Sequence, residues 1–371
     1  MSCTSCRRTS SPTPTSTSSS TASPRRCGPD DDLAAVADRR GRAAPGRRPH
    51  PRAAAAARGR GAGASASRLF TGTLALHDEL EAELADHMAQ PSALVFSTGY
   101  HANLGVVAAL ADRTTRVISD AHIHASLVDA VRLSRARLTV VPHNDVAAVA
   151  DALAAATAAG ERALVLVESV YSVLGDQAPL VELAALTETH DALLIVDEAH
   201  SVGVLGPGLV ATLGLAGQEH VLVTATLSKS LGAQGGAVLG PVAVRNHLIN
   251  RARPFIFDTG LAPAPAAGAL AALREMRARP DLGATVRRRV VALADALGVP
   301  APAGAVLSIP MESPHAAVAA QAEALARGLR VGCFRPPSVP DGVSRLRVTA
   351  TAGVSDGDWD GAVASLLEIV R

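Results

Sequence analysis

The chain has 371 residues, of which 48% are hydrophobic, and a formal net charge of +1 from 35 basic and 34 acidic side chains. At about 100–200 residues per domain, this length predicts two domains, one with a large core and one with a smaller core. The balanced charge excludes a global field that would steer nucleic acid or an anionic membrane to the protein, so we expect small-molecule ligands and neither of those partners.

Residues 1–60 differ in composition from everything that follows. Ser, Thr, Pro, Ala and Arg dominate this stretch and no apolar periodicity is found, so we predict no regular structure there. A basic interaction tail is one interpretation. A mistranslated reading frame of a GC-rich gene is another, because it would produce the same bias toward Arg, Ala, Pro and Gly.

Residues 61–250 have the pattern of a large α/β domain. Leu76, Leu80, Leu84 and Met88 recur at helical spacing and predict an amphipathic helix. Short apolar runs then alternate with helical stretches of about ten to fifteen residues, which is typical of a mostly parallel sheet covered on both faces. The predicted strands are 93–96, 116–118, 138–141, 163–167, 193–196 and 221–224.

Residues 251–371 predict a smaller C-terminal α+β domain. A helix is expected over 262–277, strands near Val306 and over 345–348, and a closing helix over 358–370. In parallel sheets, ligands bind beyond the carboxyl ends of the strands. Polar residues that directly follow the strands of the large domain are therefore the first candidates for a functional site.

The four cysteines, Cys3, Cys6, Cys27 and Cys333, suit neither a disulfide framework nor a zinc site. Cys3 and Cys6 form one CxxC pair without a second pair, so we predict no metal. The chain also has no uncharged apolar run of about 18 residues and no apolar leader, and the predicted location is cytoplasmic.

The strand predicted at 193–196 runs into Asp197, Glu198, Ala199 and His200. A carboxylate at the rim of a sheet can pair with a protonated ring nitrogen and keep it charged, and His200 could donate to a phenolic oxygen on the same ring. An ordinary polar turn is the alternative. These four residues also resemble a helicase box, but the chain has no Gly-x-x-x-x-Gly-Lys-Ser/Thr phosphate loop, which excludes that function.

Lys229 is the only lysine, and the other 34 basic residues are arginine. It follows the strand predicted at 221–224, and the nearby hydroxyls of Thr226 and Ser228 and a run of glycines could bind phosphate. An amine that is partly desolvated beside a cationic ring has a lowered pKa, which makes it a nucleophile and a base. With Asp197 and His200, Lys229 indicates a pyridoxal 5′-phosphate (PLP) enzyme in which lysine holds the cofactor as a Schiff base.

The spacing of Asp197, His200 and Lys229 resembles that of fold-type I PLP enzymes. More narrowly it resembles the α-oxoamine synthases, which condense an amino acid with an acyl-CoA and release carbon dioxide. The resemblance runs from about Gly61 to the C-terminus and implies the fold-type I architecture. Its other supporting stretches are 67–72 with His77, Leu80 and Glu81, 97–100 with Asn103, 122–126, and 168–176.

The resemblance implies a phosphate site for PLP. Gly99 and Tyr100, which open a helix after a strand, would bind the phosphate through backbone N–H groups. Thr226 would bind the phosphate or the ring hydroxyl, and Ser228 would be a further ligand. Thr259 lies in a segment through which a neighbouring subunit supplies a hydroxyl, so a homodimer with a shared active site is expected.

The resemblance also implies the residues that do the chemistry. Lys229 would remove the α-proton of the amino acid after the substrate amine displaces it. His124 would stack on the pyridine ring and take part in proton transfer. Ser172 would lie beside the cofactor, and Glu168 ends its strand in the same site.

Similarity to particular members of the family indicates the substrates. Arg347 matches the arginine that holds the amino-acid carboxylate, a task that suits a bidentate guanidinium. Residues 143–145, 228–236 and 335–340 resemble the family members of biotin biosynthesis, with Arg335 and Ser338 assigned to the substrate. These members join L-alanine to a pimeloyl thioester of CoA or of a carrier protein. The alternatives are a glycine-using member such as 2-amino-3-ketobutyrate CoA ligase, an aminotransferase, and an inactive PLP-binding structural subunit.

The resemblance fails before Gly61. Family members carry an N-terminal helix, an arginine for the acyl substrate and an Asn-x-Tyr-Leu-Gly stretch there, and none is recognisable in this sequence. We hypothesise that residues 1–60 are a frameshifted version of that region. A peptide map of the native protein that returned the segment as written would contradict this.

Overall fold

The computed structural model of the chain describes residues 61–370, so the predictions for residues 1–60 lie outside the described residues. A seven-stranded sheet with the order β1-β7-β6-β5-β4-β2-β3 forms the larger part. Every neighbouring pair is parallel except the two that β7 makes with β6 and β1. The predicted mostly parallel sheet is confirmed. Its strands are β1 (Ser92–Phe96), β2 (Thr115–Asp120), β3 (Arg137–Val141), β4 (Arg162–Glu168), β5 (Leu193–Asp197), β6 (Val221–Thr226) and β7 (Gly236–Gly240).

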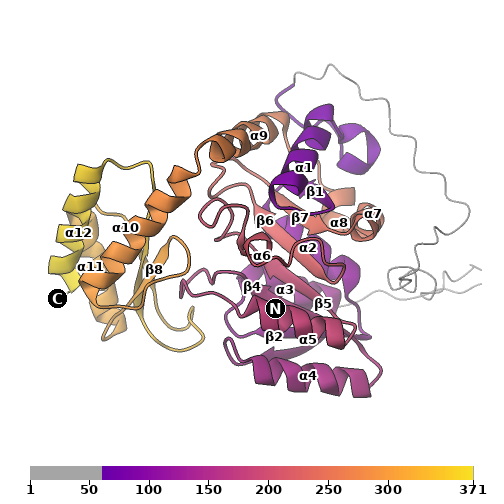
Figure 1. The fold of residues 1–371 in the computed structure, drawn as a ribbon, viewed down its shortest axis with the longest axis horizontal. Coiled ribbons are helices and arrows are strands. Elements are labelled where there is room, and N and C mark those ends of the chain that lie inside the picture. The colour runs from indigo at the N-terminus through magenta and orange to yellow at the C-terminus, as the bar shows by residue number, and fades with distance from the viewer. Residues whose placement is uncertain (1–60, 371) are drawn as a thin grey trace, which may run out of the picture. The chain divides into compact units, whose positions relative to one another are not determined.

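Helices cover both faces of this sheet (Figure 1). Alternate strand residues join two separate hydrophobic clusters, because successive side chains of a strand point to opposite faces. In β4, for example, Val165 and Val167 belong to one cluster and Leu164 and Leu166 to the other. The first face packs against α1 (Ala75–His87), α4 (Val146–Ala158), α5 (Leu180–Thr189), α6 (Leu209–Thr212) and α9 (Pro263–Ala278), and the second against α2 (Gly99–Leu110), α3 (Ala125–Ser134), α7 (Val242–Arg251) and α8 (Arg253–Ile256).

Strand β7 is the one element of the large sheet that the sequence does not predict. Only three apolar residues lie between its terminal glycines, too few to stand out as a strand. The glycine at its start is required by packing, since a Cβ on Gly236 would lie 2.4 Å from the Thr98 carbonyl oxygen and 2.5 Å from the Gly99 Cα. Gly236 therefore lets β7 pass directly beside the turn between β1 and α2.

A small antiparallel sheet with the order β8-β10-β9 forms the rest of the fold. Together with three helices it encloses a hydrophobic cluster of its own, as expected for the predicted α+β arrangement. Helices α7, α8 and α9 instead pack on the large sheet, and the domain boundary near residue 250 stays a prediction. The elements of this part are α10 (Asp281–Leu297), β8 (Val306–Pro310), α11 (Pro314–Ala326), β9 (Gly332–Phe334), β10 (Arg345–Thr349) and α12 (Asp356–Val370).

A buried charge network fixes the turn that precedes α1. Arg68, in the π-helical turn η1 (Arg68–Gly72), donates to Glu81 Oε1 at 2.8 Å and to the Val95 carbonyl oxygen at 3.2 Å. Glu81 also accepts from the Val95 amide at 3.0 Å and from Arg245 at 3.0 Å. Because Glu81 and Arg68 are both buried, each needs the other as a partner.

Replacing Glu81 with alanine is expected to lower the free energy of unfolding by about 3–5 kcal/mol, because the Arg68 guanidinium would remain buried without its carboxylate. Urea unfolding measures the loss. Glu79→Ala is the matched control: Glu79 pairs with Arg274 in solvent, and its removal should cost less than about 1 kcal/mol. Equal losses from the two variants would contradict the role of the network.

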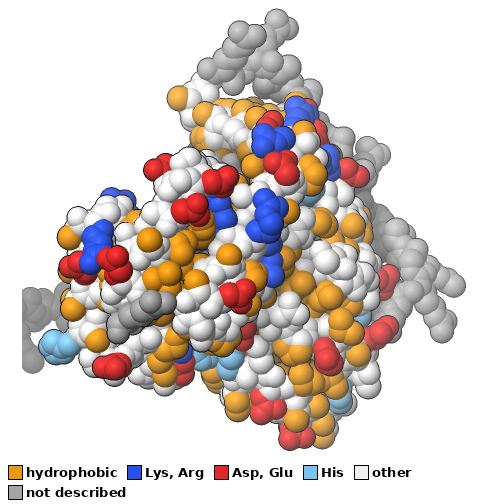
Figure 2. All heavy atoms as spheres, turned by 60° about the vertical axis from the view of Figure 1, so that its left-hand side comes forward, with side chains coloured by type: hydrophobic (Ala, Val, Ile, Leu, Met, Phe, Trp, Pro, Cys, Tyr) orange, Lys and Arg blue, Asp and Glu red, His pale blue; other side chains and the backbone are white. Residues whose placement is uncertain are grey.

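On the face shown in Figure 2, acidic and basic side chains are interspersed. Ion pairs of mixed sign also occur between α1 and α9, where Arg274 pairs with both Glu79 and Glu83. This face therefore presents no extended field of one sign. Among residues 61–370, no helix combines the length and the apolar character needed to cross a membrane.

Candidate active site

A cavity of about 280 Å³ lies at the carboxyl edge of the large sheet, the position at which such sheets bind ligands. Its floor is made by neighbouring strands in register, with Glu168 of β4 beside Asp197 of β5, and Asp197 beside Thr224 of β6. The ends of α2 and α3 complete the wall. The lining residues are Thr98, Gly99, Tyr100, Asn103, His124, Ser126, Glu168, Asp197, Ala199, Thr224, Ala225, Thr226, Ser228 and Lys229.

Asp197 ends β5 and is only 6% exposed. Its Oδ2 accepts a hydrogen bond from Asn103 Nδ2 at 2.8 Å, and its Oδ1 accepts from the Ala199 amide at 3.0 Å. These two donors fix the orientation of the carboxylate at the floor of the cavity. The predicted position of Asp197 at the rim of the sheet is thus found, and its orientation depends on a residue from α2.

Asn103 orients His124 as well. Its Nδ2 donates to Ser126 Oγ at 2.8 Å, and Ser126 Oγ lies 2.8 Å from His124 Nδ1. The Ser126 amide also donates to His124 Nδ1 at 3.2 Å, so this nitrogen is an acceptor and the ring proton belongs on Nε2. Loss of water around the ring lowers the pKa of His124, against the charge of Asp197.

From the sequence, Asn103 is predicted only as part of a stretch that matches the family, and no role is predicted for Ser126. The signal for Asn103 is its spacing: it follows Gly99 by about one helical turn, which puts both on the same face of α2. The sequence signal for Ser126 is weaker, because its hydroxyl acts only by linking Asn103 to His124 through hydrogen bonds.

Lys229 Nζ lies 2.9 Å from His200 Nε2. Burial lowers the pKa of His200 to about 2, with help from the charges of Lys229 and Arg347, so the imidazole is neutral and its Nε2 accepts from the amine. The side chain of Lys229 opens into the cavity, and the loss of water around its amine lowers its pKa, against the charge of the Asp197 carboxylate. An amine that loses its proton readily can serve as nucleophile and base.

Glu168 ends β4 and is 2% exposed. Burial and the charge of Asp197 raise its pKa to about 8, so the carboxyl group is protonated near neutral pH. The Ser172 amide donates to its Oε2 at 3.0 Å, while its Oε1 has no hydrogen-bond partner in the described part of the chain. A neutral carboxylic acid therefore lines the cavity, with one oxygen free for a ligand.

The wall at the start of α2 supplies backbone donors and hydroxyls. Thr98 caps the helix by accepting from the His101 amide at 3.0 Å, and the amides of Gly99 and Tyr100 have no acceptor within residues 61–370. Thr226 Oγ1 packs against this turn and lies 2.8 Å from Ser228 Oγ. Unpaired helix N–H groups beside two hydroxyls form an anion site.

These groups together match PLP. The cavity offers a carboxylate for a ring nitrogen, an imidazole, an amine, and an anion site for phosphate. Its buried Asn103 Oδ1 and Thr224 Oγ1 have no partner among the described residues, which marks polar positions that a ligand would satisfy. The residues present therefore fit the cofactor that the sequence predicts.

Six predicted residues lie outside the lining of this cavity: Ser172, His200, Thr259, Arg335, Ser338 and Arg347. His200 contacts the cavity through Lys229, and Ser172 through Glu168. Arg347, half-buried on β10, lies near enough for its charge to help lower the pKa of Lys229. Arg335 and Ser338 are exposed on the segment between β9 and β10. Thr259 is exposed in the segment after α8, and its role, like theirs, stays a prediction.

Comparison with known proteins gives consistent results. The profile of the family Aminotransferase class I and II matches residues 43–366. The chain is 55% identical over 296 residues to the 8-amino-7-oxononanoate synthase of Mycolicibacterium gilvum, covering 79% of this chain and 77% of that protein.

Solved structures agree with this similarity. The serine palmitoyltransferase of Sphingomonas wittichii superposes with a TM-score of 0.79 at 31% identity, over 84% of this chain and 80% of that one. The 8-amino-7-oxononanoate synthase of Francisella tularensis gives a TM-score of 0.70 at 26% identity, over 80% of this chain and 88% of that one. A further serine palmitoyltransferase structure, with a TM-score of 0.77 and 31% identity over the same shares of the two chains, holds PLP as an internal aldimine.

Proposed function

Because the chain belongs to the 8-amino-7-oxononanoate synthases, PLP-dependent acyltransferases within the class I and II aminotransferase family, we propose that it joins L-alanine to a pimeloyl thioester. The products are 8-amino-7-oxononanoate, carbon dioxide and the free thiol. The observation that carries the proposal is the convergence of the only lysine, the buried Asp197 and the oriented His124 at one edge of the sheet. The 55% identity to a protein of that name supports the choice of substrates.

We assign the cofactor to the cavity described above. Asp197 would pair with the ring nitrogen, His124 would stack on the ring, and Lys229 would be the covalent anchor. The amides of Gly99 and Tyr100 would bind the phosphate, with the hydroxyls of Thr226 and Ser228. PLP, when bound, supplies an electron sink for the carbanion that forms at the α-carbon of the amino acid.

In this proposal Lys229 removes the α-proton of L-alanine, which its lowered pKa favours. The neutral His200 accepts a hydrogen bond from the lysine amine and keeps it directed at the substrate. Glu168, protonated near neutral pH, is available as a hydrogen-bond donor at the floor of the cavity. Each group thus has the protonation state that its task requires.

Arg347 is assigned to the substrate carboxylate. Its guanidinium lies 5.7 Å from the centre of the Phe334 ring, and it has no ion-pair partner within residues 61–370. A half-buried cation without a carboxylate is suited to bind one from the substrate.

Replacing Arg347 with alanine is expected to raise KM for L-alanine by about 100-fold, because a charge-assisted bidentate pair of about 2–5 kcal/mol is lost. Steady-state kinetics with varied L-alanine measures it. Arg347→Lys should recover little, since an ammonium cannot form the paired contacts. The exposed Arg330 provides the control, and Arg330→Ala should leave KM unchanged.

A second copy of the chain is the proposed partner. Phe70 on η1 and Phe257 after α8 are 71% and 63% exposed, and η1 and α8 contact one another. Two exposed rings of this size favour a protein interface. Thr259, two residues after Phe257, would then reach the neighbouring phosphate site. Light scattering is expected to give the mass of a dimer, and a monomer that is fully active would contradict the shared site.

The deciding experiment incubates the purified PLP-loaded protein with L-alanine or glycine and pimeloyl-CoA. Free CoA and the amino ketone from L-alanine are the expected products. Product from glycine alone would favour a glycine-using synthase, and conversion of PLP to its pyridoxamine form by amino acid alone would favour an aminotransferase. Cofactor colour without any product would instead indicate an inactive PLP-binding subunit.

A further inference from the structure

A second polar cluster lies beside the cavity, and the proposed mechanism does not use it. At its centre His143, which follows β3, stands between two carboxylates: Nδ1 is 2.9 Å from Asp120 Oδ1, and Nε2 is 2.9 Å from Asp176 Oδ2. Since both ring nitrogens face acceptors, the ring makes both bonds only as an imidazolium. Burial alone would lower the pKa of His143, but its hydrogen bonds to Asp120 and Asp176 raise it to about 9.

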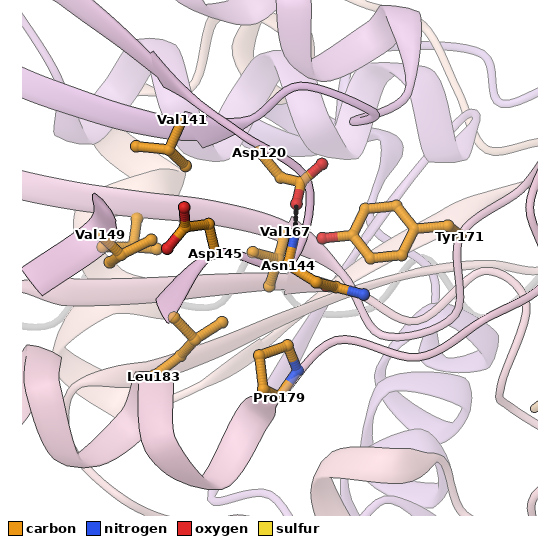
Figure 3. Close-up of a pocket in the computed structure, with 10 residues that line it drawn as sticks. Asp120, Val141, Asn144, Asp145, Val149, Val167, Tyr171, Pro179 and Leu183 are labelled. Atoms are coloured by element: carbon orange, nitrogen blue, oxygen red, sulfur yellow. Dashed lines mark hydrogen bonds between the residues drawn. The ribbon is translucent and has the colours of Figure 1, made fainter. Parts of the chain in front are cut away.

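Asn144 joins the same two carboxylates. Its backbone N–H donates to Asp120 Oδ2 at 2.7 Å, the bond drawn in Figure 3. Its Nδ2 donates to Asp176 Oδ2 at 3.0 Å and to the Gln177 carbonyl oxygen at 3.1 Å. The β3–α4 turn therefore holds both carboxylates through two consecutive residues.

Other titratable groups face the His143 ring. His122 packs on it with 4.6 Å between ring centres, and Tyr171 packs edge-on at 4.4 Å. Burial lowers the pKa of His122 and raises that of Tyr171, so both are neutral near neutral pH. Beyond His122 lie Asp341 and Arg345, which pair with each other. His143 is thus the cation that faces Asp120 and Asp176 within the cluster.

The cluster connects two segments that carry site residues. Asp120 ends β2, and its Oδ1 also accepts from the His122 amide at 2.7 Å, in the turn that leads to His124. Asp176 lies in the 169–178 loop, which follows Glu168 and contains Ser172. His143 is therefore a bridge between the turn of His124 and this loop.

The 169–178 loop also contacts β8 and the segment that leads into it. The Gly175 carbonyl oxygen accepts from the Ala303 amide at 2.8 Å. Gly175 has a φ of +80°, and a Cβ there would lie 2.2 Å from the Val306 carbonyl oxygen. The loop therefore contacts the start of the small sheet through Gly175 and the β3–α4 turn through Asp176 and Gln177.

The cluster is not a second ligand site. The cavity beside it measures about 10 Å³, room for one water at most. In Figure 3 the Tyr171 hydroxyl points toward Asp120 and Asn144, and apolar side chains such as Leu183 close the other side. Within residues 61–370, no group of three or more His, Cys, Asp or Glu side chains is arranged to hold a metal ion.

We propose that His143 is a positioning residue for the condensation: its contacts with Asp120 and Asp176 hold the 169–178 loop against the turn of His124. The inference rests on the proposed function of the site. Without the cation, two carboxylates would face each other across the β3–α4 turn, one of them buried, and the loop would move away from the turn. A shift of about 1 Å in a positioning segment can cost roughly 100-fold in rate.

The test is His143→Gln in the full-length, PLP-loaded protein. We expect kcat to fall by about 10- to 100-fold, while KM for L-alanine, which depends on Arg347, is retained. Hydrogen exchange of the amides in the 169–178 loop should become faster, with β4, β5 and β6 unchanged. His315→Gln, exposed on α11, is the control and should alter neither measurement.

The pH profile separates positioning from a passive structural role. The folded protein keeps His143 protonated to a higher pH than the unfolded chain does, so the stabilisation is complete below the ordinary histidine pKa and is lost as pH rises through about 9. Protection of the loop amides, taken relative to the exchange rate of the unfolded chain at each pH, should therefore fall above pH 9 in the unchanged protein, and His143→Gln should lack this step. Asp176→Asn should act in the same direction, and the double variant should be no worse than His143→Gln alone.

Wild-type kcat and loop exchange in His143→Gln would overturn the inference, as would faster exchange spread over the whole chain. If His143→Gln does not fold, Asp176→Asn, which keeps the bond to Asp120, carries the same comparisons. Failure of the proposed function is a different result: the unchanged protein would form no product, and loop exchange alone would then decide the role of His143.

Discussion

Lys229→Ala is expected to lower the rate of condensation by about 10²- to 10⁴-fold, the range of a lost general base, and to remove the covalent anchor of the cofactor. The amine has no substitute, because Lys229 is the only lysine in the chain. The surroundings of the Lys229 amine also suit it to act as a base. The loss of water around the amine lowers its pKa, and His200 accepts a hydrogen bond from it at 2.9 Å. Release of CoA at saturating substrate measures the rate.

Two comparisons sharpen this result. Lys229→Arg retains a cation but not an amine that can deprotonate, and it should be as inactive as Lys229→Ala. Treatment of the loaded protein with borohydride, followed by peptide mapping, should find the cofactor on the peptide that contains Lys229. Turnover by Lys229→Ala near that of the unchanged protein would show that another group is the base.

Asp197→Asn is expected to reduce turnover by about 10²- to 10³-fold, as when a preorganised electrostatic contact is lost from an active site. The substitution keeps the shape but removes the negative charge that would pair with a ring nitrogen. It also places an amide N–H₂ group near two existing donors, Asn103 Nδ2 and the Ala199 amide. Affinity for PLP, measured by titration of the apo protein, should fall together with kcat.

The control for Asp197→Asn is Asp151→Asn, which makes the same chemical change on the exposed face of α4. It should affect neither turnover nor cofactor affinity. If Asp197→Asn kept full turnover, the carboxylate would have no role in holding a charged ring, and the assignment of the cofactor to this cavity would be wrong.

The residues that directly follow strands could be predicted from the sequence. An apolar run shows where a strand ends, and the carboxyl ends of parallel strands meet at one edge, so Asp197 and Lys229 follow from local pattern. Strand β7 could not be predicted in this way, because three apolar residues between glycines carry no periodic signal. Its antiparallel direction depends on contacts with β1 and β6, which are far from it in the sequence.

The polar residues within and between helices could not be assigned from local pattern either. Asn103 and Ser126 matter because α2 and α3 bring them together beside Asp197. His143 was part of a matching stretch, yet its role depends on carboxylates from β2 and from the 169–178 loop. These contacts form only in the tertiary fold, so a local sequence pattern cannot predict them.

The two hydrogen bonds donated by Asn103 restrict which amino acids that position can accept. One N–H₂ group serves Asp197 and Ser126 at once, at 2.8 Å each. Serine or threonine would bring a single proton, aspartate would bring none, and glutamine would carry its amide one carbon too far into the cavity. A substitution at this position would therefore misorient the Asp197 carboxylate and the His124 imidazole together. We expect the chain to tolerate far fewer substitutions at residue 103 than its place inside a helix suggests.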